Sequence, residues 1–376
     1  MAFAALSFYI ISNRSNRDDV SLLSQRLPSF FTDSIYIYND NPFSEAKAAL
    51  GRYLFYDRRL SFNNTKSCAS CHDQKFAFTD GYRRSVGVYG DLLQRNSPTL
   101  INIIYKKYLT AADSSLHYPE KQINNPMFHT TPVELGWKGN EKDILERIKG
   151  DPHYKKEFES IFGNDESITI KNVQYCITTF VKSIVSYSSP FDNYFYQKRN
   201  MRSASETRGM QLFFSAKLGC SSCHGGNNFD KPSVKNDHGE IEYYFNTGLY
   251  NINNTGNYPG YDQGLFEFTH IITDKGKYRV PTLRNLAFTA PYYHDGSVAT
   301  LEEVIANYAT GGRLITNGLF KGDGKVNAYK SHLIHGFTIS PDEKKDLVNF
   351  LLSLSDSSVL TNKSFGNPFA YDETRL

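Results

Sequence analysis

Apolar side chains recur every three or four residues in several separate stretches of the chain. Such spacing places them on one face of a helix. The first stretch opens at Pro42-Phe43-Ser44-Glu45 and runs to Leu54, and three more follow it. The predicted helices cover 42–54, 143–148, 154–162 and 169–187. Because long polar stretches separate them, the pattern predicts a mostly α fold with long loops and little β-structure.

Three further helices are indicated by capping boxes, in which a Ser or Thr is followed three residues later by Glu. The boxes are Ser203-Ala204-Ser205-Glu206, Thr300-Leu301-Glu302-Glu303 and Ser340-Pro341-Asp342-Glu343, the last with Pro at the first helical position. The stretch 224–291 is rich in Gly, Asn and Tyr and has no helical period. We expect long loops there, with at most one short hairpin.

One five-residue motif occurs twice, as Cys68-Ala69-Ser70-Cys71-His72 and as Cys220-Ser221-Ser222-Cys223-His224. It is the attachment signal of c-type haem, in which two thiols bond to the porphyrin edge and the imidazole reaches the iron. A shared zinc ion would need neighbouring Cys pairs, yet about 150 residues separate these two. In a redox-active dithiol, the His that follows each Cys pair would have no chemical role. The sequence therefore predicts two covalent haems with His72 and His224 as iron ligands.

The remaining composition narrows the class of protein. The 376 residues include 5 Cys and carry a formal charge of +3, which the propionates of two haems, about four, would bring close to neutral. The fifth thiol, Cys176, lies on a predicted helix and is expected to be buried and inert. With no basic run and no binding motif, we predict no nucleic-acid partner.

The organisation of the chain repeats itself once, as helix, haem motif, loops and helix. This predicts two cytochrome c-like haem domains at 41–188 and 189–365, with a C-terminal tail after them. Residues 1–40 are interpreted as a leader remnant, from a secretory or lipoprotein signal, followed by a polar arm. The apolar start is too short to span a bilayer, so no transmembrane span is expected. Covalent haem predicts a periplasmic or extracytoplasmic location.

Further motifs accompany the two haem signals in a fixed order. They are Gly51-Arg52-Tyr53-Leu54-Phe55-Tyr56-Asp57, Arg95-Asn96-Ser97-Pro98-Thr99, Pro132-Val133-Glu134-Leu135-Gly136, Val280-Pro281-Thr282-Leu283-Arg284-Asn285 and Pro291-Tyr292-Tyr293-His294-Asp295-Gly296. This order resembles the bacterial di-haem cytochrome c peroxidase and MauG superfamily over residues 40–356. Other segments resemble the narrower MbnH-like group of methanobactin operons, among them Pro126-Met127-Phe128, Asn246-Thr247-Gly248-Leu249-Tyr250-Asn251 and Gly264-Leu265-Phe266-Glu267.

The resemblance implies a peroxide-reactive first haem. Glu134 matches the family's acid–base residue, with Gln122 as its hydrogen-bonding partner and Pro126 shaping the pocket. In ordinary di-haem peroxidases the loop after the first haem motif supplies a His that blocks the iron, but 86–94 contains none. The first haem is therefore expected to be five-coordinate or water-bound, and Tyr89 is the alternative ligand.

At the second haem, the resemblance to MauG-like enzymes assigns Tyr308 as axial ligand. Ordinary electron-transfer peroxidases use Met there, and no Met follows the second motif. A phenolate lowers the iron potential and favours the storage of two oxidising equivalents. Without the resemblance, a Tyr on the face of Leu301 and Val304 is a core residue. Arg284 and His294 fall in family motifs near this haem. The resemblance implies that they bind the haem propionates or hold the residues around the haem in place. Core or loop roles are the alternative.

Between the haems the resemblance implies a Ca²⁺ ion. The Asn96 side chain and the backbone carbonyls of Arg279 and Pro281 match the family's ligands. The alternative is an Asn that caps a turn.

The chain departs from the family at the Trp between the haems. Ala111 or Ala112 stands in its place, and the one Trp of the chain is Trp137. Tyr105 or Tyr108 takes over the Trp's role, or charge-sharing between the haems is weaker.

These features together predict a peroxide-dependent, two-haem oxidase of MauG type. By its resemblance to the MbnH-like group, it would use H2O2 to oxidise a secreted partner protein, such as an MbnP-like copper-binding protein, with conversion of Trp to kynurenine. One alternative is a cytochrome c peroxidase that reduces H2O2 with electrons from a small cytochrome or cupredoxin. The other is a non-enzymatic di-haem electron carrier.

Overall fold

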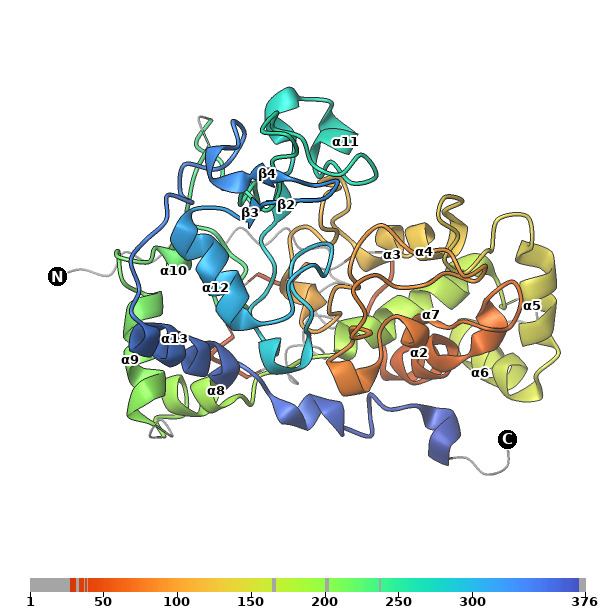
Figure 1. Cartoon of the computed structure of the whole chain (residues 1–376). Coiled ribbons are helices and arrows are strands. Elements are labelled where there is room, and N and C mark those ends of the chain that lie inside the picture. Colours follow the sequence, from red (N-terminus) through yellow and green to blue (C-terminus); the bar gives the residue numbers. More distant parts are fainter. Residues whose placement is uncertain are drawn as a thin grey trace.

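The computed structural model describes residues 28–31, 34–36, 38, 40–163, 167–199, 203–236 and 238–371. The chain folds mostly into helices joined by long loops, with two small antiparallel sheets (Figure 1). This confirms the mostly α fold class. Within these ranges, every helix is too short or too polar to cross a membrane. The predicted leader lies outside the described residues.

The N-terminal half is built on two helices that pack along each other, α2 (Glu45–Tyr56) and α7 (Ile170–Ser183). Helix α2 begins where the side chain of Ser44 accepts a hydrogen bond from the backbone N–H of Lys47. The other helices of this half are α3 (Pro119–Gln122), α4 (Asn124–Phe128), α5 (Glu141–Lys149) and α6 (Pro152–Phe162).

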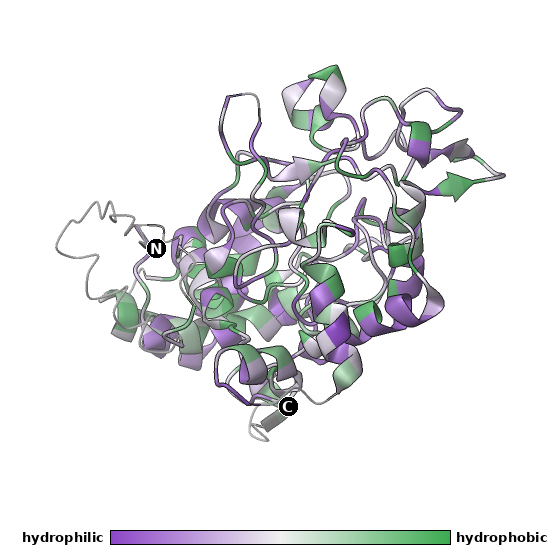
Figure 2. Ribbon diagram, turned by 90° about the vertical axis from the view of Figure 1, so that its left-hand side faces the viewer, coloured by the Kyte–Doolittle hydropathy of each residue, from purple (hydrophilic) through white to green (hydrophobic). Residues whose placement is uncertain are grey.

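The C-terminal half is built in the same way, on α9 (Ala204–Phe213) packed against α13 (Pro341–Ser353). In Figure 1 this pair lies on the opposite side of the molecule from α2 and α7. The other helices of this half are α8 (Pro190–Phe195), α10 (Cys220–Cys223), α11 (Phe266–Thr269) and α12 (Leu301–Thr310). Along the larger helices, apolar and polar bands alternate (Figure 2), as expected for helices with one buried face.

The sheets are minimal. Strand β1 (Tyr244–Phe245) pairs with β2 (Tyr278–Arg279), and β3 (Leu314–Ile315) pairs with β4 (Gly322–Asp323). Strands β1 and β2, which pair inside 224–291, lie far apart in the sequence and do not form a short hairpin. The short hairpin of the structure is β3 with β4, later in the chain. The 3-10 turns are Arg58–Leu60, Cys68–Ser70, Gln74–Phe76, Ile103–Tyr105, Ile272–Asp274, Leu286–Phe288, Gly324–Val326, Ser357–Leu360 and Pro368–Tyr371.

The helix predictions are confirmed, with differences at the caps. The four periodic stretches correspond to α2, α5, α6 and α7, and the three boxes precede α9, α12 and α13. The boxes at Thr300 and Ser340 are complete, whereas at Ser203 only the bond from the Glu206 N–H forms. Helix α8 was absent from the predictions, although Ser189 opens it with a complete box.

The same close contact between two helices occurs once in each half. A Cβ at Gly51 of α2 would lie 1.9 Å from the carbonyl oxygen of Cys176 on α7. A Cβ at Gly209 of α9 would lie 1.9 Å from the carbonyl oxygen of Asp346 on α13. Only glycine permits backbones to approach so closely. As predicted, Cys176 is completely buried, and burial raises the pKa of its thiol to about 12.

Aromatic contacts repeat beside these glycines. The rings of Phe55 and Phe180 have centroids 5.2 Å apart, and those of Phe213 and Phe350 are also 5.2 Å apart. Each pair lies in its own hydrophobic cluster, one for the N-terminal and one for the C-terminal half. Each haem motif is therefore supported by its own helix pair and apolar core.

Replacing Gly209 by Ala should lower the free energy of unfolding by about 1–3 kcal/mol, because the new methyl group overlaps the Asp346 carbonyl. Urea denaturation of the holoprotein measures the change. Gly260→Ala is the matched control, since no atom lies within 4 Å of a Cβ there. Equal stability of the two variants would contradict the close helix contact.

After α13 the chain returns to the N-terminal half (Figure 1). Phe365 joins the cluster of that half, with its ring 6.4 Å from that of Phe78. Gln74 donates to the carbonyl of Val359 over 2.8 Å, and Tyr56 donates to that of Phe365 over 2.7 Å. The last part of 189–365 therefore contributes to the core around the first haem motif.

Candidate haem sites and active site

The first haem motif forms the 3-10 turn Cys68–Ser70 followed by His72. The Nδ1 atom of His72 lies 3.0 Å from the carbonyl oxygen of Phe78 and 3.2 Å from Oγ of Ser97. Because Nδ1 is engaged, Nε2 is the nitrogen left to bind a metal. Burial lowers the pKa of His72, which favours the neutral imidazole that iron binds.

The second motif repeats this geometry. The Nδ1 atom of His224 lies 3.0 Å from the carbonyl oxygen of Phe229, and burial lowers the pKa of this His as well. All four motif thiols are free and half-buried. Two thiols and one available Nε2 on a single turn are the donors that a c-type haem requires, so both motifs fit a covalent haem.

The loops that hold the two His residues are fixed in the same way. Thr99 donates through Oγ1 to the carbonyl of Ala77, and Thr282 to that of Asn228, over 2.6 Å in each case. Each carbonyl comes directly before the Phe that binds the motif His. The Thr of each Pro-Thr-Leu motif therefore helps to position the His of a haem motif.

A partly open cavity lies beside the first motif. It brings Glu134 and Pro126 to the cysteines and to His72, as the family motif implied. Gln122, at the end of α3, does not line it. The lining residues are Lys66, Ser67, Cys68, Cys71, His72, Val86, Gly87, Leu93, Pro126, Glu134 and Leu135.

Glu134 is positioned by the loop that follows the first motif. The N–H of Val88 donates to the carbonyl of Glu134 over 3.1 Å. Gly87 permits this approach, because a Cβ there would lie 2.0 Å from the carbonyl oxygen of Val133. Burial raises the pKa of Glu134 to about 7. A carboxyl group with this pKa can both accept and return a proton near neutral pH.

The alternative ligand Tyr89 does not line the cavity. Its side chain is 58% exposed and packs against Phe62, with ring centroids 5.8 Å apart. His129 is exposed. His117 bonds through Nδ1 to the Lys107 carbonyl over 2.8 Å, which is an ordinary loop role.

Tyr308 lies near the end of α12, in the neighbourhood of the second motif. Burial raises its pKa well above the usual value, and the nearby phenol of Tyr293 and thiols of Cys223 and Cys220 add to the rise. Leu301 on the same helix is buried in the C-terminal cluster. The helix is thus anchored by its apolar face, with Tyr308 close to the second pair of cysteines.

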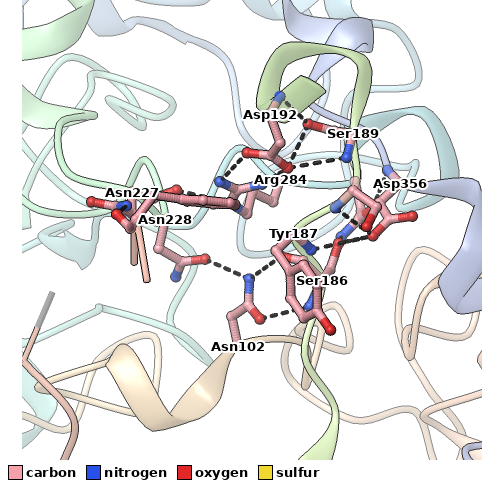
Figure 3. A network of polar contacts seen from close by, with 12 residues as sticks. Asn102, Ser186, Tyr187, Ser189, Asp192, Asn227, Asn228, Arg284 and Asp356 are labelled. Atoms are coloured by element: carbon pink, nitrogen blue, oxygen red, sulfur yellow. Dashed lines mark hydrogen bonds and ion pairs between the residues drawn. The ribbon is translucent and has the colours of Figure 1, made fainter. Parts of the chain in front are cut away.

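Arg284 is fully buried and makes its contacts within the protein (Figure 3). Its Nη1 and Nη2 atoms donate to the two carboxylate oxygens of Asp192 over 2.8 and 2.9 Å. Its Nε donates to the carbonyl of Asn227 over 2.8 Å. Since Asp192 also closes the capping box of α8, Arg284 ties the second haem loop to that helix. These contacts match an ordering role.

The same network joins the two halves (Figure 3). Asn102 donates from Nδ2 to the carbonyl of Ser186 over 3.0 Å and to Oδ1 of Asn228 over 3.3 Å. Asp356 accepts from the hydroxyl of Ser186 and from the N–H of Tyr187, both over 3.2 Å. Buried polar groups therefore connect the loops behind the two haem motifs.

His294 is buried in a second polar cluster. Its ring stacks on Tyr278, with centroids 3.5 Å apart and planes at 9°. Its Nε2 lies 3.7 Å from Oδ2 of Asp262, which also accepts from Arg95 over 3.0 Å. Burial lowers the pKa of His294. These contacts again order a loop.

The predicted calcium ligands lie in different local settings. Asn96 donates from Nδ2 to the carbonyl of Tyr82 over 2.7 Å. Arg279 lies on β2, and its N–H donates to the carbonyl of Ala111 over 2.8 Å. No contact within the described ranges joins Asn96 to Arg279 or Pro281, so calcium stays a prediction.

The region of the missing Trp is rich in tyrosine. Ala112 is completely buried. Tyr108 packs edge-on against Tyr243 and Tyr244, with ring centroids 5.2 and 5.4 Å away. Tyr105 is buried in a separate small cluster. The replacement of the Trp by Tyr105 or Tyr108 stays a prediction.

Sequence reasoning did not single out several residues at the first site. Lys66, Val86 and Leu93 line the cavity, and Ser97 contacts His72. Ser97 had a signal, its place in the Arg95-Asn96-Ser97-Pro98-Thr99 motif. Val86 and Leu93 also had one, their place in the loop 86–94 that follows the first haem motif. Lys66 had none beyond its nearness to Cys68 in the sequence.

The chain is similar to several known proteins. The family described as di-haem cytochrome c peroxidase matches residues 45–200. The methylamine utilization protein MauG of Methylorubrum extorquens is 30% identical over 84% of this chain and 79% of its own length. Cytochrome-c peroxidase IdrP1 of Pseudomonas sp. strain SCT is 32% identical over 85% of this chain and 84% of its own.

A solved structure extends the likeness. A MauG-like protein associated with microbial copper homeostasis superposes with a TM-score of 0.86 at 40% identity, over 91% of this chain and 98% of that one. The chain belongs to the di-haem cytochrome c peroxidase and MauG family. It is an oxidoreductase of peroxidase type whose family carries two haems.

Proposed function

We propose that the chain is a peroxide-dependent oxidase that oxidises a partner protein. The observation that carries the proposal is the cavity in which Glu134, with a pKa of about 7, lies beside the first haem motif. The likeness to a MauG-like protein associated with copper homeostasis favours a copper-binding partner, oxidised from Trp to kynurenine. We further propose a periplasmic or extracytoplasmic location, and a division of the haems between 41–188 and 189–365.

Proton transfer is the part of the reaction that the chain itself performs. His72 would hold a haem here, and that haem would supply the redox chemistry by which H2O2 is reduced. Glu134 accepts a proton from one peroxide oxygen and delivers it to the other, which leaves as water. Val86, Leu93 and Leu135 give the cavity an apolar wall. Pro126 narrows the same cavity. Gln122 does not line it, so a hydrogen bond from Gln122 at this site stays a prediction.

At the second site we propose that His224 and Tyr308 would hold the iron, with Tyr308 as phenolate. In Tyr308→Phe the potential of one haem should rise and its absorption spectrum should change, because an anionic ligand that stabilises oxidised iron is lost. Potentiometric titration of the holoprotein measures both. Tyr261→Phe changes a tyrosine that is 38% exposed and serves as control. A spectrum unchanged from the parent protein would remove Tyr308 from the iron.

The partner reaction is tested with purified proteins. The holoprotein, H2O2 and a small secreted copper-binding protein encoded beside it should give a partner whose Trp has gained oxygen in mass spectrometry. Omitting H2O2 is the control. An unmodified partner, together with rapid turnover of reduced cytochrome c, would instead support a cytochrome c peroxidase, the function that the IdrP1 likeness favours.

A further inference from the structure

A second, partly open cavity is lined by residues other than those around Glu134 and has a different chemical character. Of the described residues that line it, four are basic, namely Lys106, Lys107, Lys231 and Arg279. One is acidic, Asp230, and the rest are tyrosines and one serine. The cavity therefore has an excess of positive charge and hydroxyl donors around it, which suits an anion.

Lys106 connects this cavity to the first haem motif. It is only 5% exposed, and its Nζ donates to the carbonyl of Thr99 over 3.2 Å. Thr99 in turn holds the Ala77 carbonyl beside the loop that binds His72. The Lys106 ammonium is close enough to His72 to help lower the pKa of that imidazole. The cation thus lies behind the first haem ligand.

Arg279 and Asp230 connect the cavity to the second motif. Arg279 comes two residues before Pro281, whose carbonyl interacts with His224. Asp230 directly follows Phe229, whose carbonyl holds Nδ1 of the same His. The cavity is therefore flanked by the supports of both haem ligands.

Among the described residues that line the cavity, basic groups outnumber the single carboxylate. Burial and repulsion from Arg279 lower the pKa of Lys106 to about 7, and attraction to Asp230 opposes this. Asp230 also acts on Arg279. Among the described residues that act on both Lys106 and Arg279, Asp230 is the one carboxylate, and two buried cations beside one carboxylate favour the entry of another anion. The chain's own haems carry such anions, as propionates.

We propose that this cavity binds a carboxylate between Lys106 and Arg279, and that the carboxylate is a propionate of one of the protein's own haems. Arg284, which the sequence suggested for this task, is already committed to Asp192. The inference depends on the two haems that the family carries and not on the proposed oxidase activity.

Redox titration of the holoprotein tests the proposal. In Lys106→Met the midpoint potential of one haem should shift downward, because the propionate loses a cation and its charge then favours ferric iron. Lys106→Arg keeps the charge and should stay near the parent value. Lys142→Met, on the exposed side of α5, is the control for a general change of charge. A Lys106→Met shift no larger than that of the control would overturn the proposal.

A dissolved anion is distinguished from a propionate by titration with acetate at constant ionic strength. A fixed propionate predicts potentials that do not depend on acetate, whereas a dependence present in the parent and lost in Lys106→Met would overturn the assignment to haem. Where Lys106→Met does not retain two haems, redox-difference infrared spectra of the parent and Lys106→Arg decide. Carboxylate bands that differ in position between the parent and Lys106→Arg support the contact between Lys106 and a propionate. Bands at the same position in both proteins contradict it.

Discussion

Replacing Glu134 by Gln should slow the reaction of the holoprotein with H2O2 by about 10²–10⁴-fold, the usual contribution of a positioned acid–base group. Gln has nearly the same shape and keeps the cavity filled, but it cannot accept and return a proton. Stopped-flow absorbance of the haems measures the rate. Glu146→Gln, at a side chain 57% exposed on α5, is the matched control. Equal rates for the two variants would exclude Glu134 from proton transfer.

The pH dependence gives an independent reading of the same residue. Because burial raises the pKa of Glu134 to about 7, the carboxyl is protonated below that pH and ionised above it. Only the ionised form can take a proton from H2O2. The rate in the parent protein should therefore rise as pH increases through about 7 and then level off. In Glu134→Gln this rise should vanish, and a persisting rise would point to another base.

Replacing Arg284 by Met should lower the free energy of unfolding by about 3–5 kcal/mol, because it leaves the carboxylate of Asp192 buried without its partner. Both side chains of this pair are 0% exposed. Urea denaturation of the holoprotein measures the loss. Arg208→Met removes an exposed partner of Asp346 and should change stability little.

A second substitution separates lost charge balance from lost packing. Adding Asp192→Asn to Arg284→Met removes the unpaired carboxylate and should recover part of the stability, since an amide oxygen can still accept a hydrogen bond. No recovery would mean that packing of the Arg284 side chain, against Phe31 and Phe229, accounts for the loss.

The parts of the fold that could be predicted are those encoded locally. Periodic apolar residues and caps locate α2, α5, α6, α7, α9, α12 and α13, and each haem motif carries its ligands within five residues. The approach of Glu134 to the first motif followed only from the resemblance to a family. No local rule brings it to Cys68, because its position depends on Gly87 and the loop beside it.

The features that escaped prediction depend on residues distant in sequence. Arg284 reaches Asp192 across 92 positions, and β1 pairs with a strand that follows a long loop. Helix α8 had a local signal at Ser189-Pro190-Phe191-Asp192, but it is short and lies where the two halves were divided. Lys106 carried no signal in the sequence, and Arg279 was assigned only a calcium-binding carbonyl, whereas the fold places both side chains on one cavity.

The return of the C-terminal segment to Phe78 has a consequence for biogenesis. Phe365 and Val359 are among the last described residues to be synthesised, yet they belong to the apolar cluster of the N-terminal half. That cluster is complete only once the segment carrying Val359 and Phe365 has folded back onto Phe78. Until then the loop that carries His72 is incompletely packed, which leaves Cys68 and Cys71 accessible for haem attachment.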